Sequence, residues 1–552
     1  MKTSKVLKSF KLFQKSKVES PIPIPNEIFN LRTYIFAILA SFGAIISGYD
    51  TGFIGGTVTL ESFRHEFGID KMSSSHATYV NSNIISVFHV GAFFGALGIY
   101  PIGELYGRRI ALFLSGFFLT FGAAISLISN SQRGLGAIYA GRVLTGVGIG
   151  FCSGITPMYV GEISPPSIRG QLTGLWEIAW QIGGLVGYWI NLGVNKHVSN
   201  PTSQWLIPFA VQIIPSGLFW IGVVFLPESP RWLISKYKRD EAEEKLSYIT
   251  TLPKDHEFVQ FELGKMEEKR ELKRKLYGEG IFQQIKTVIF SSRYIKRLIL
   301  STSTFILQNG AGINAVTYYS VTVFKSIGLS GADAKLFSTG LFGVIKLVAA
   351  VVWLGLIVDN WGRRAAFFWG CIPCGIAMWY LGAYIKVSDP ASKLATGNVK
   401  LDSGGKGALA MFYIWTFVYG ATFNGTCWVY CAELFDQDVR SLVSAINASS
   451  NWFWAFIFAR FTGNMFNAMG YGVYFLFASC MTVGPLFVFW FFPETKGVPL
   501  EVIDHLFEVP AWRGREYALS KIERSSKEDR DEREESTERE DISVKQTKSE
   551  HD

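Results

Sequence analysis

The chain has 552 residues, of which 49% are hydrophobic and only 18% charged, and its formal net charge is +8. The apolar residues gather in stretches of roughly 20, the length that a helix needs to cross a bilayer, and this excludes a string of soluble domains. The positive charge lies in loops between these stretches, so it does not indicate a nucleic-acid partner.

Twelve stretches are apolar and long enough to be membrane-spanning helices. The predicted spans are 33–54, 84–103, 110–129, 137–160, 173–194, 205–226, 298–320, 336–358, 365–387, 407–431, 442–466 and 472–492. The N-terminal segment has six lysines and no apolar core of its own, so it is not a cleaved signal peptide. We therefore predict an all-α membrane protein.

Lys and Arg crowd one set of loops, and the alternate loops 55–83, 130–136, 195–204 and 388–406 carry few. The positive-inside rule then places both termini and the large central loop in the cytoplasm. The predicted parts are a cytoplasmic segment 1–32, a six-helix bundle 33–226, a loop with short helices 227–297, a second six-helix bundle 298–492 and a cytoplasmic, largely disordered tail 493–552.

Two motifs occur once in each half. "IGELYGRRIA" (101–110) follows the second span, and "IVDNWGRRAA" (357–366) follows the eighth. "PESPRW" (227–232) closes the sixth span, and "PETKG" (493–497) closes the twelfth. A duplicated six-helix unit with a site between its copies is typical of secondary transporters.

Eight motifs in order make the chain resemble the sugar porter branch of the major facilitator superfamily over roughly residues 30–510. They are "GYDTGFIGG", "GELYGRR", "GRVLTGVGIGFCSGITPMYVGEISPPSIRGQL", "PESPRWL", "GINAVTYYS", "VDNWGRR", "WVYCAELF" and "PETKG". Within the branch it most resembles fungal quinate permeases, on "SQWLIPFAVQ", "QNGAGINAVTYYS", "ELFDQDVRSL", "NWFWAFIFARFT" and Lys346.

The resemblance implies a set of gating residues at the cytoplasmic helix ends. Glu104 and Asp359 would pair with arginines on neighbouring helices, and the further pairs would be Glu162 with Arg169, Glu228 with Arg231, and Glu433 with Arg440. We call the two Gly-Arg-Arg motifs the corners, and their arginines are Arg108, Arg109, Arg363 and Arg364. The alternative is structural: arginines at cytoplasmic helix ends satisfy the positive-inside rule without gating anything.

Asp50, at the end of the first span, is a candidate proton carrier, because an acid inside a membrane is costly unless it is paired or wetted. The resemblance places Arg142 beside it, as in proton-coupled members. The alternative is a helix-end carboxylate in an outer vestibule.

The substrate site is predicted from polar side chains on apolar spans. Gln308, Asn309 and Asn314 match positions where sugar porters bind ring hydroxyls, and a kink at Gly310 or Gly312 would let them face one cavity. The remaining predicted contacts are Glu177, Gln181, Trp428, Tyr318 and Tyr319, the two tyrosines as an outer gate. One departure from the pattern is Ala455, where sugar and quinate porters have Asn.

Lys346 lies near the middle of the eighth span. Hexose carriers have an uncharged residue at or beside this position, whereas quinate permeases resemble this chain in having a lysine. An ammonium there costs about 2.5–3.5 kcal/mol on insertion scales, so it needs an anion or water. We predict that it binds the carboxylate of the substrate. The alternative is a permanent ion pair with Glu177 or Asp50.

We therefore predict proton-coupled uptake of quinate or a similar polyhydroxylated carboxylate across a plasma membrane by alternating access. The alternatives are a hexose or pentose transporter of the same fold and a nutrient receptor that does not transport. The partners are a small-molecule substrate, protons and the bilayer; no cofactor, metal, nucleic acid or enzymatic activity is expected. Cys371-x-x-Cys374 lies within a span without a histidine partner and is interpreted as packing.

Overall fold

A computed structural model describes residues 25–165, 168–278, 280–358, 360–395, 401–436 and 439–522. Over these residues the chain is helical and contains no strand, as the predicted fold class requires. Three predictions, for the N-terminal segment as far as residue 24, for Asp359 and for the tail from 523 onward, lie outside the described residues.

Twelve helices or broken helices match the predicted spans. In the first half they are α2 (Leu31–Thr57), α4 (Ser74–Tyr106), α5 (Arg108–Ser126), α6 (Gly136–Ile163), α7 (Arg169–His197) and the pair α8 (Pro201–Val211) and α9 (Ile213–Val224). In the second half they are α14 (Ser292–Gly310) with α15 (Ile313–Tyr318), α17 (Ala332–Val352) with η4 (Trp353–Ile357), α18 (Arg363–Ser388), α20 (Ser403–Tyr419) with η5 (Gly420–Asn424) and α21 (Gly425–Glu433), α22 (Arg440–Met469), and α23 (Gly472–Phe491).

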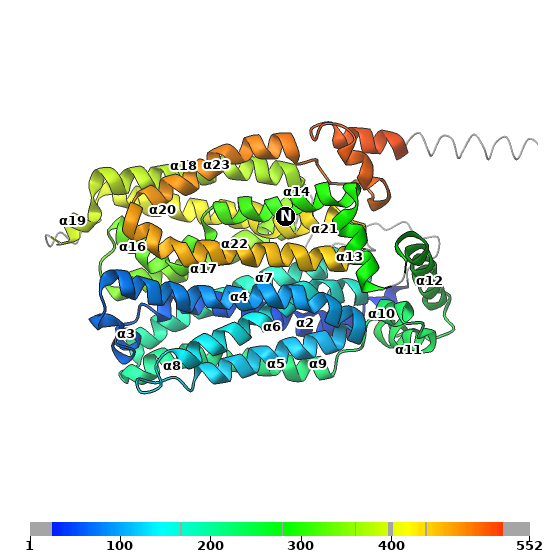
Figure 1. Cartoon of the computed structure of the whole chain (residues 1–552), viewed down its shortest axis with the longest axis horizontal. Coiled ribbons are helices and arrows are strands. Elements are labelled where there is room, and N and C mark those ends of the chain that lie inside the picture. The colour runs from blue at the N-terminus through cyan, green and yellow to red at the C-terminus, as the bar shows by residue number, and fades with distance from the viewer. Residues whose placement is uncertain are drawn as a thin grey trace, which may run out of the picture.

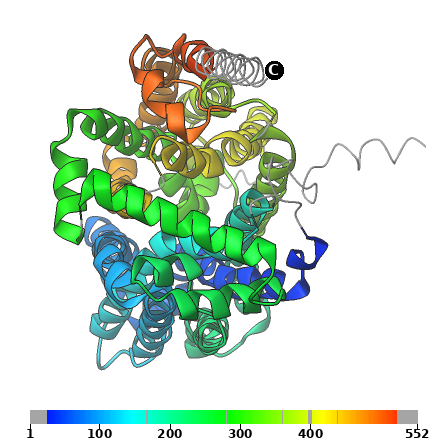
Figure 2. The same ribbon diagram turned by 90° about the vertical axis from the view of Figure 1, so that its right-hand side faces the viewer.

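Shorter elements cap the two ends of the bundle. At one end are η2 (Asn26–Ile28), α10 (Pro230–Ser235), α11 (Arg239–Thr250), α12 (Glu257–Tyr277), α13 (Ile281–Phe290) and η6 (Leu500–Phe507). At the other are α3 (Glu61–Glu66), η3 (Ile69–Lys71), α16 (Ser320–Ile327) and α19 (Pro390–Ala395). We call the first the Gly-Arg-Arg end, because both corners lie there, and the second the Tyr319 end. Figure 2 looks at the Gly-Arg-Arg end, with α10–α13 lying across it in green.

The two halves lie one above the other in Figure 1, with the blue and cyan helices below and the yellow and orange ones above. Most of the buried apolar side chains divide into one cluster for each half, and α22 contributes Trp452 and Ala455 to the cluster of the first half. The halves meet where α4 packs on α22, α7 on α17, and α2 on α15. The interface between these three pairs is where a duplicated transporter places its site.

Within the described residues, eight helical stretches are long and apolar enough to cross a membrane by themselves. The four predicted spans that fall short are α7, α14–α15, α20–α21 and α22. Their polar residues lower the mean hydropathy, and the same four spans carry the buried amides described below.

Candidate substrate and proton site

A cluster of amide side chains lies on the second half where it faces the first. Gln308 and Asn309 of α14 and Asn314 of α15 are at least nine-tenths buried. The Nε2 of Gln308 donates to the backbone oxygen of Asn424 at 3.2 Å, and the Nδ2 of Asn309 donates to the Oδ1 of Asn451 at 3.3 Å. These amides offer both donors and acceptors, which is what a polyhydroxylated ligand requires.

The predicted kink is at Gly312. Its φ of 93° separates α14 from α15, and a Cβ there would meet the Phe477 ring at 3.0 Å. Only glycine adopts such a backbone without strain. The break brings Asn314 back toward α14, so that its Nδ2 donates to the Oδ1 of Asn309.

Glu177 and Gln181 come from α7 of the first half and reach this cluster. They lie one turn apart, and the Nε2 of Gln181 donates to the Oε1 of Glu177 at 2.5 Å. The same oxygen accepts a hydrogen bond from the Nδ2 of Asn424. Glu177 therefore connects the two halves through Asn424.

Lys346 of α17 is 8% exposed and lies in the same interface. Its Nζ is 5.4 Å from the centroid of the Phe342 ring, and the ammonium is attracted by the carboxylate of Glu177. Among the described residues, however, no acid lies within ion-pair distance of it, so neither alternative pair is formed in direct contact. The predicted cation is thus buried in the same interface as the amides, without an acid in direct contact among the described residues.

Asp50 is paired with Arg142, as the resemblance implies. The Nη1 of Arg142 donates to the Oδ1 of Asp50 at 3.3 Å, and both side chains are almost fully buried. The guanidinium also lies over the Phe88 ring, at 5.1 Å. One carboxylate oxygen of Asp50 has no hydrogen-bond partner within the described part of the chain, which leaves a position for a proton.

The three predicted aromatic contacts lie on either side of the amides. The hydroxyl of Tyr318 is 3.0 Å from the Nε2 of His89, and that of Tyr319 donates to the backbone oxygen of Ala459 at 2.9 Å and lies 3.0 Å from the Oγ of Ser82. Both tyrosines therefore contact α4 of the other half. Trp428 packs edge-on against Phe305, with ring centroids 5.1 Å apart, and borders both apolar clusters.

At the first corner, Arg108 binds two acids of its own half. Its Nη2 lies 3.0 Å from the Oε1 of Glu104, and its Nε lies 3.1 Å from the Oε2 of Glu162. In this arrangement the direct contact of Glu162 is Arg108, and Arg169 is only within electrostatic range of it, so the pair of Glu162 with Arg169 stays a prediction. Arg109 instead donates to the backbone oxygen of Val224.

Among the described residues, the hydrogen bonds of Glu228 are with backbone groups and not with Arg231, so that predicted pair stays a prediction. Glu228 accepts hydrogen bonds from the backbone N–H groups of Arg108 and Arg109, at 2.9 Å and 3.2 Å, and so caps the first turn of α5. Gly107, with φ 102°, allows this approach, since a Cβ there would meet the carboxylate at 2.4 Å. Burial raises the pKa of Glu228, and these backbone donors partly offset the effect.

The second corner repeats the first. The backbone N–H groups of Arg363 and Arg364 donate to Glu494 at 3.0 Å and 3.1 Å, and the Nη2 of Arg364 donates to the backbone oxygen of Phe489 at 2.9 Å. The Nη2 of Arg363 lies 2.5 Å from the Oε1 of Glu433, while Arg440 is only within electrostatic range of that acid, so the pair of Glu433 with Arg440 stays a prediction. As in the first half, the acid contacts the arginine of the corner.

Three predicted gating arginines remain, and they come from both halves. Arg169, Arg231 and Arg440 lie within electrostatic range of one another. In the described ranges, the Nε atoms of Arg169 and Arg440 are buried without a hydrogen-bond partner. These arginines therefore retain donors for an acid that reaches them in a different arrangement of the halves.

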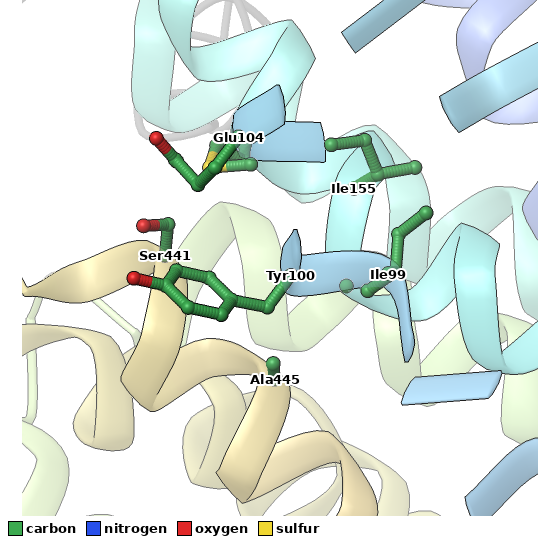
Figure 3. A pocket seen from close by; sticks show the side chains of 8 residues that line it. Ile99, Tyr100, Glu104, Ile155, Ser441 and Ala445 are labelled. Carbon is green, nitrogen blue, oxygen red and sulfur yellow. The ribbon is translucent and has the colours of Figure 1, made fainter. Parts of the chain in front are cut away.

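A cavity of about 10 Å³, enough for a single water, lies between the halves near this end. Figure 3 shows Tyr100 and Glu104 of α4 facing Ser441 and Ala445 of α22 across it. Glu104 hydrogen-bonds Ser441, and the Tyr100 hydroxyl donates to Gln284 of α13 at 2.8 Å. The halves are thus in contact at this end through polar side chains that can separate.

The sequence gives a signal for three functional residues that the predictions did not include. Asn424 and Asn451 are amides within apolar spans, the same signal that selected Gln308. Asn451 lies one turn before Ala455 on α22, so it supplies an amide close to where the family pattern has one. Glu494 stands in "PETKG" where Glu228 stands in "PESPRW", and the repeat alone predicts its role.

Residues 36–507 match the profile of the family described as "Sugar (and other) transporter". Among curated relatives, a probable quinate permease of Neosartorya fischeri is 47% identical over 506 residues, covering 92% of this chain and 93% of its own. A probable quinate permease of Aspergillus niger is 47% identical over 501 residues, covering 91% and 92%. The chain therefore belongs to the sugar transporter family, whose members are multi-pass membrane transporters and not enzymes.

Solved structures agree with this assignment. The proton:xylose symporter XylE bound to 6-bromo-6-deoxy-D-glucose superposes with a TM-score of 0.69 at 25% identity, covering 86% of this chain and 99% of its own. The inward-open conformation of XylE from E. coli gives 0.67 at 23% identity, with the same coverage of both chains. The fold is that of the major facilitator superfamily.

Proposed function

We propose that this protein imports quinate, or a similar polyhydroxylated carboxylate, together with protons across the plasma membrane by alternating access. The observation that carries the proposal is Lys346, a buried ammonium beside a cluster of amides, with no acid in direct contact among the residues that the structure describes. The amides of Gln308, Asn309, Asn314 and Gln181 bind the hydroxyl groups, and Lys346 binds the carboxylate. The names of the curated relatives support this substrate class.

Proton coupling is assigned to Asp50 and Arg142. Asp50 is ionised while it is paired with Arg142 and is protonated when the pair opens toward the outside. The change in charge then alters the packing of α2 on α6 and thereby favours one arrangement of the halves. The printed description of XylE as a proton:xylose symporter supports coupling in this fold.

The Gly-Arg-Arg end is assigned to the cytoplasm, with both termini, because it carries the basic loops. Its charged residues act as a gate: Arg108 and Arg363 hold the corners, while the Nε groups of Arg169 and Arg440, which have no hydrogen-bond partner in the described part of the chain, donate to acids when the halves move relative to each other at this end. Tyr318 and Tyr319 form the opposite gate.

A second candidate is a hexose or pentose carrier, which the XylE structures favour. The deciding experiment is uptake of labelled quinate by cells that express this chain and lack their own carriers, with excess unlabelled glucose or xylose. Quinate uptake that ignores both sugars supports the proposal. Sugar uptake without quinate uptake makes the protein a sugar porter. If neither is taken up, the remaining alternative is a nutrient receptor that does not transport.

A further inference from the structure

The interface holds an acid that the proposed mechanism does not use. Glu177 is 9% exposed and lies on α7, on the opposite side of the interface from Lys346 on α17. The two side chains attract each other electrostatically but are not in direct contact. With both groups ionised in the empty carrier, one positive and one negative charge balance each other in a medium of low dielectric.

An anionic substrate disturbs this balance. When its carboxylate reaches Lys346, the interface contains two negative charges and one positive charge. A buried charge without a partner costs several kcal/mol, and buried carboxyl groups then become neutral by taking a proton. The carboxylate left without a counter-charge is then Glu177, because Lys346 pairs with the substrate.

We propose that Glu177 is a second proton-carrying site, which takes up one proton when an anionic substrate binds to Lys346. The inference rests on the proposed function, since it requires a carboxylate substrate. The proton comes from the outer medium, travels with the substrate and leaves to the cytoplasm when the substrate does. The site has a net charge of zero both empty and loaded.

The contacts of Glu177 suit both protonation states. Gln181 and Asn424 both donate to Oε1. A neutral carboxyl keeps that oxygen as a carbonyl acceptor and carries its proton on Oε2. Protonation therefore breaks neither hydrogen bond, and Glu177 still links the halves through Asn424.

The groups around Glu177 do not supply another counter-charge. From the second half, the titratable groups that act on it are Lys346, Tyr419 of α20 and Cys427 of α21. On the helices of its own half that pack against α7, Asp50 of α2 and Arg142 of α6 are paired with each other. This separate pairing also makes Glu177 independent of Asp50 as a proton carrier.

The test counts protons taken up per quinate bound. The full-length protein in detergent is titrated with quinate by calorimetry in buffers of different ionisation enthalpy, which gives the number of protons directly. Glu177→Gln keeps the size of the side chain and its acceptor oxygen, and it should take up one proton fewer than the wild type. Glu61→Gln, at an exposed acid of α3, is the control and should leave the number unchanged.

A second variant tests the inference even if Glu177→Gln does not fold. In Asp50→Asn, quinate binding should still take up one proton, and an uptake of zero overturns the inference. Equal proton numbers in the wild type and in Glu177→Gln also overturn it, and the proposed function then stands. If the folded wild type does not bind quinate at all, the proposed function fails and the inference fails with it.

Discussion

Buried charges in this protein are balanced by specific neighbours, and each can be tested one residue at a time. Asp50 and Arg142 form an ion pair within the first half. Lys346 has an acid within electrostatic range but, among the described residues, none in contact. In the proposed function, this difference separates a proton-carrying group from a group that binds the substrate.

Lys346→Asn should weaken quinate binding at least tenfold, because removing one partner of a buried charge pair costs about 2–5 kcal/mol. Binding of a neutral sugar, if there is any, should be kept, since asparagine still offers hydrogen bonds. Isothermal titration of the purified variant measures both. Lys335→Asn, on the first turns of the same helix, is the matched control. Unchanged quinate affinity in Lys346→Asn would remove the anion site.

Asp50→Asn should abolish accumulation of substrate against its gradient but keep exchange of internal for external substrate. The amide has the size of the acid and cannot carry the proton, so the halves still move without being coupled to the proton gradient. Accumulation with and without an uncoupler, beside exchange in proteoliposomes, measures the two processes. Asp70→Asn, at an exposed acid of η3, should change neither. Accumulation that survives in Asp50→Asn would place the proton elsewhere.

Among the secondary-structure elements, the corners are helix caps built from distant motifs. Glu228 binds the first backbone N–H groups of α5, and Glu494 those of α18. A carboxylate at this position satisfies donors that have no partner in the helix, and it also complements the positive end of the helix dipole. The motif that closes the first half thereby fixes the start of the third span, α5. The motif that closes the second half fixes the start of the ninth span, α18.

Glu494→Ala should lower the free energy of unfolding by about 0.5–2 kcal/mol, the usual cost of losing a helix cap. Thermal unfolding in detergent, followed by the fluorescence of the tryptophans, measures the loss. Glu244→Ala, at an exposed acid of α11, is expected to have no measurable effect. If the two variants unfold at the same temperature, the cap does not contribute to stability.

For the whole molecule, the Tyr319 end is held together by close backbone packing between the halves. A Cβ on Gly55 of α2 would meet the backbone oxygen of Tyr318 at 2.4 Å. The charged Gly-Arg-Arg end instead meets through Glu104 and Ser441, side chains that can exchange partners. The two ends therefore differ in chemistry: the contact at the Tyr319 end depends on a small residue, and the Gly-Arg-Arg end meets through polar and charged side chains.

Gly55→Val should prevent closure at the Tyr319 end and so reduce transport strongly without unfolding the protein. A cysteine introduced at Ser82, which is fully buried here, should react faster with a membrane-impermeant reagent when Gly55→Val is present. Gly217→Val is the control, because nothing lies within 4 Å of a Cβ at that glycine. Unchanged reactivity at Ser82→Cys would show that this contact does not gate the path.

The sequence by itself determined the twelve spans, the two matched corners, a kink at Gly310 or Gly312 and the polar side chains that face the interface. These features depend on local composition: hydropathy sets a span, and an isolated amide or lysine in lipid must turn inward. The tertiary structure alone decided which charges pair. Glu162 contacts Arg108, Glu433 contacts Arg363, and Glu228 caps a helix. Ion pairs depend on distances between helices far apart in the chain, and the same distances place Glu177 near Lys346 but not in contact with it.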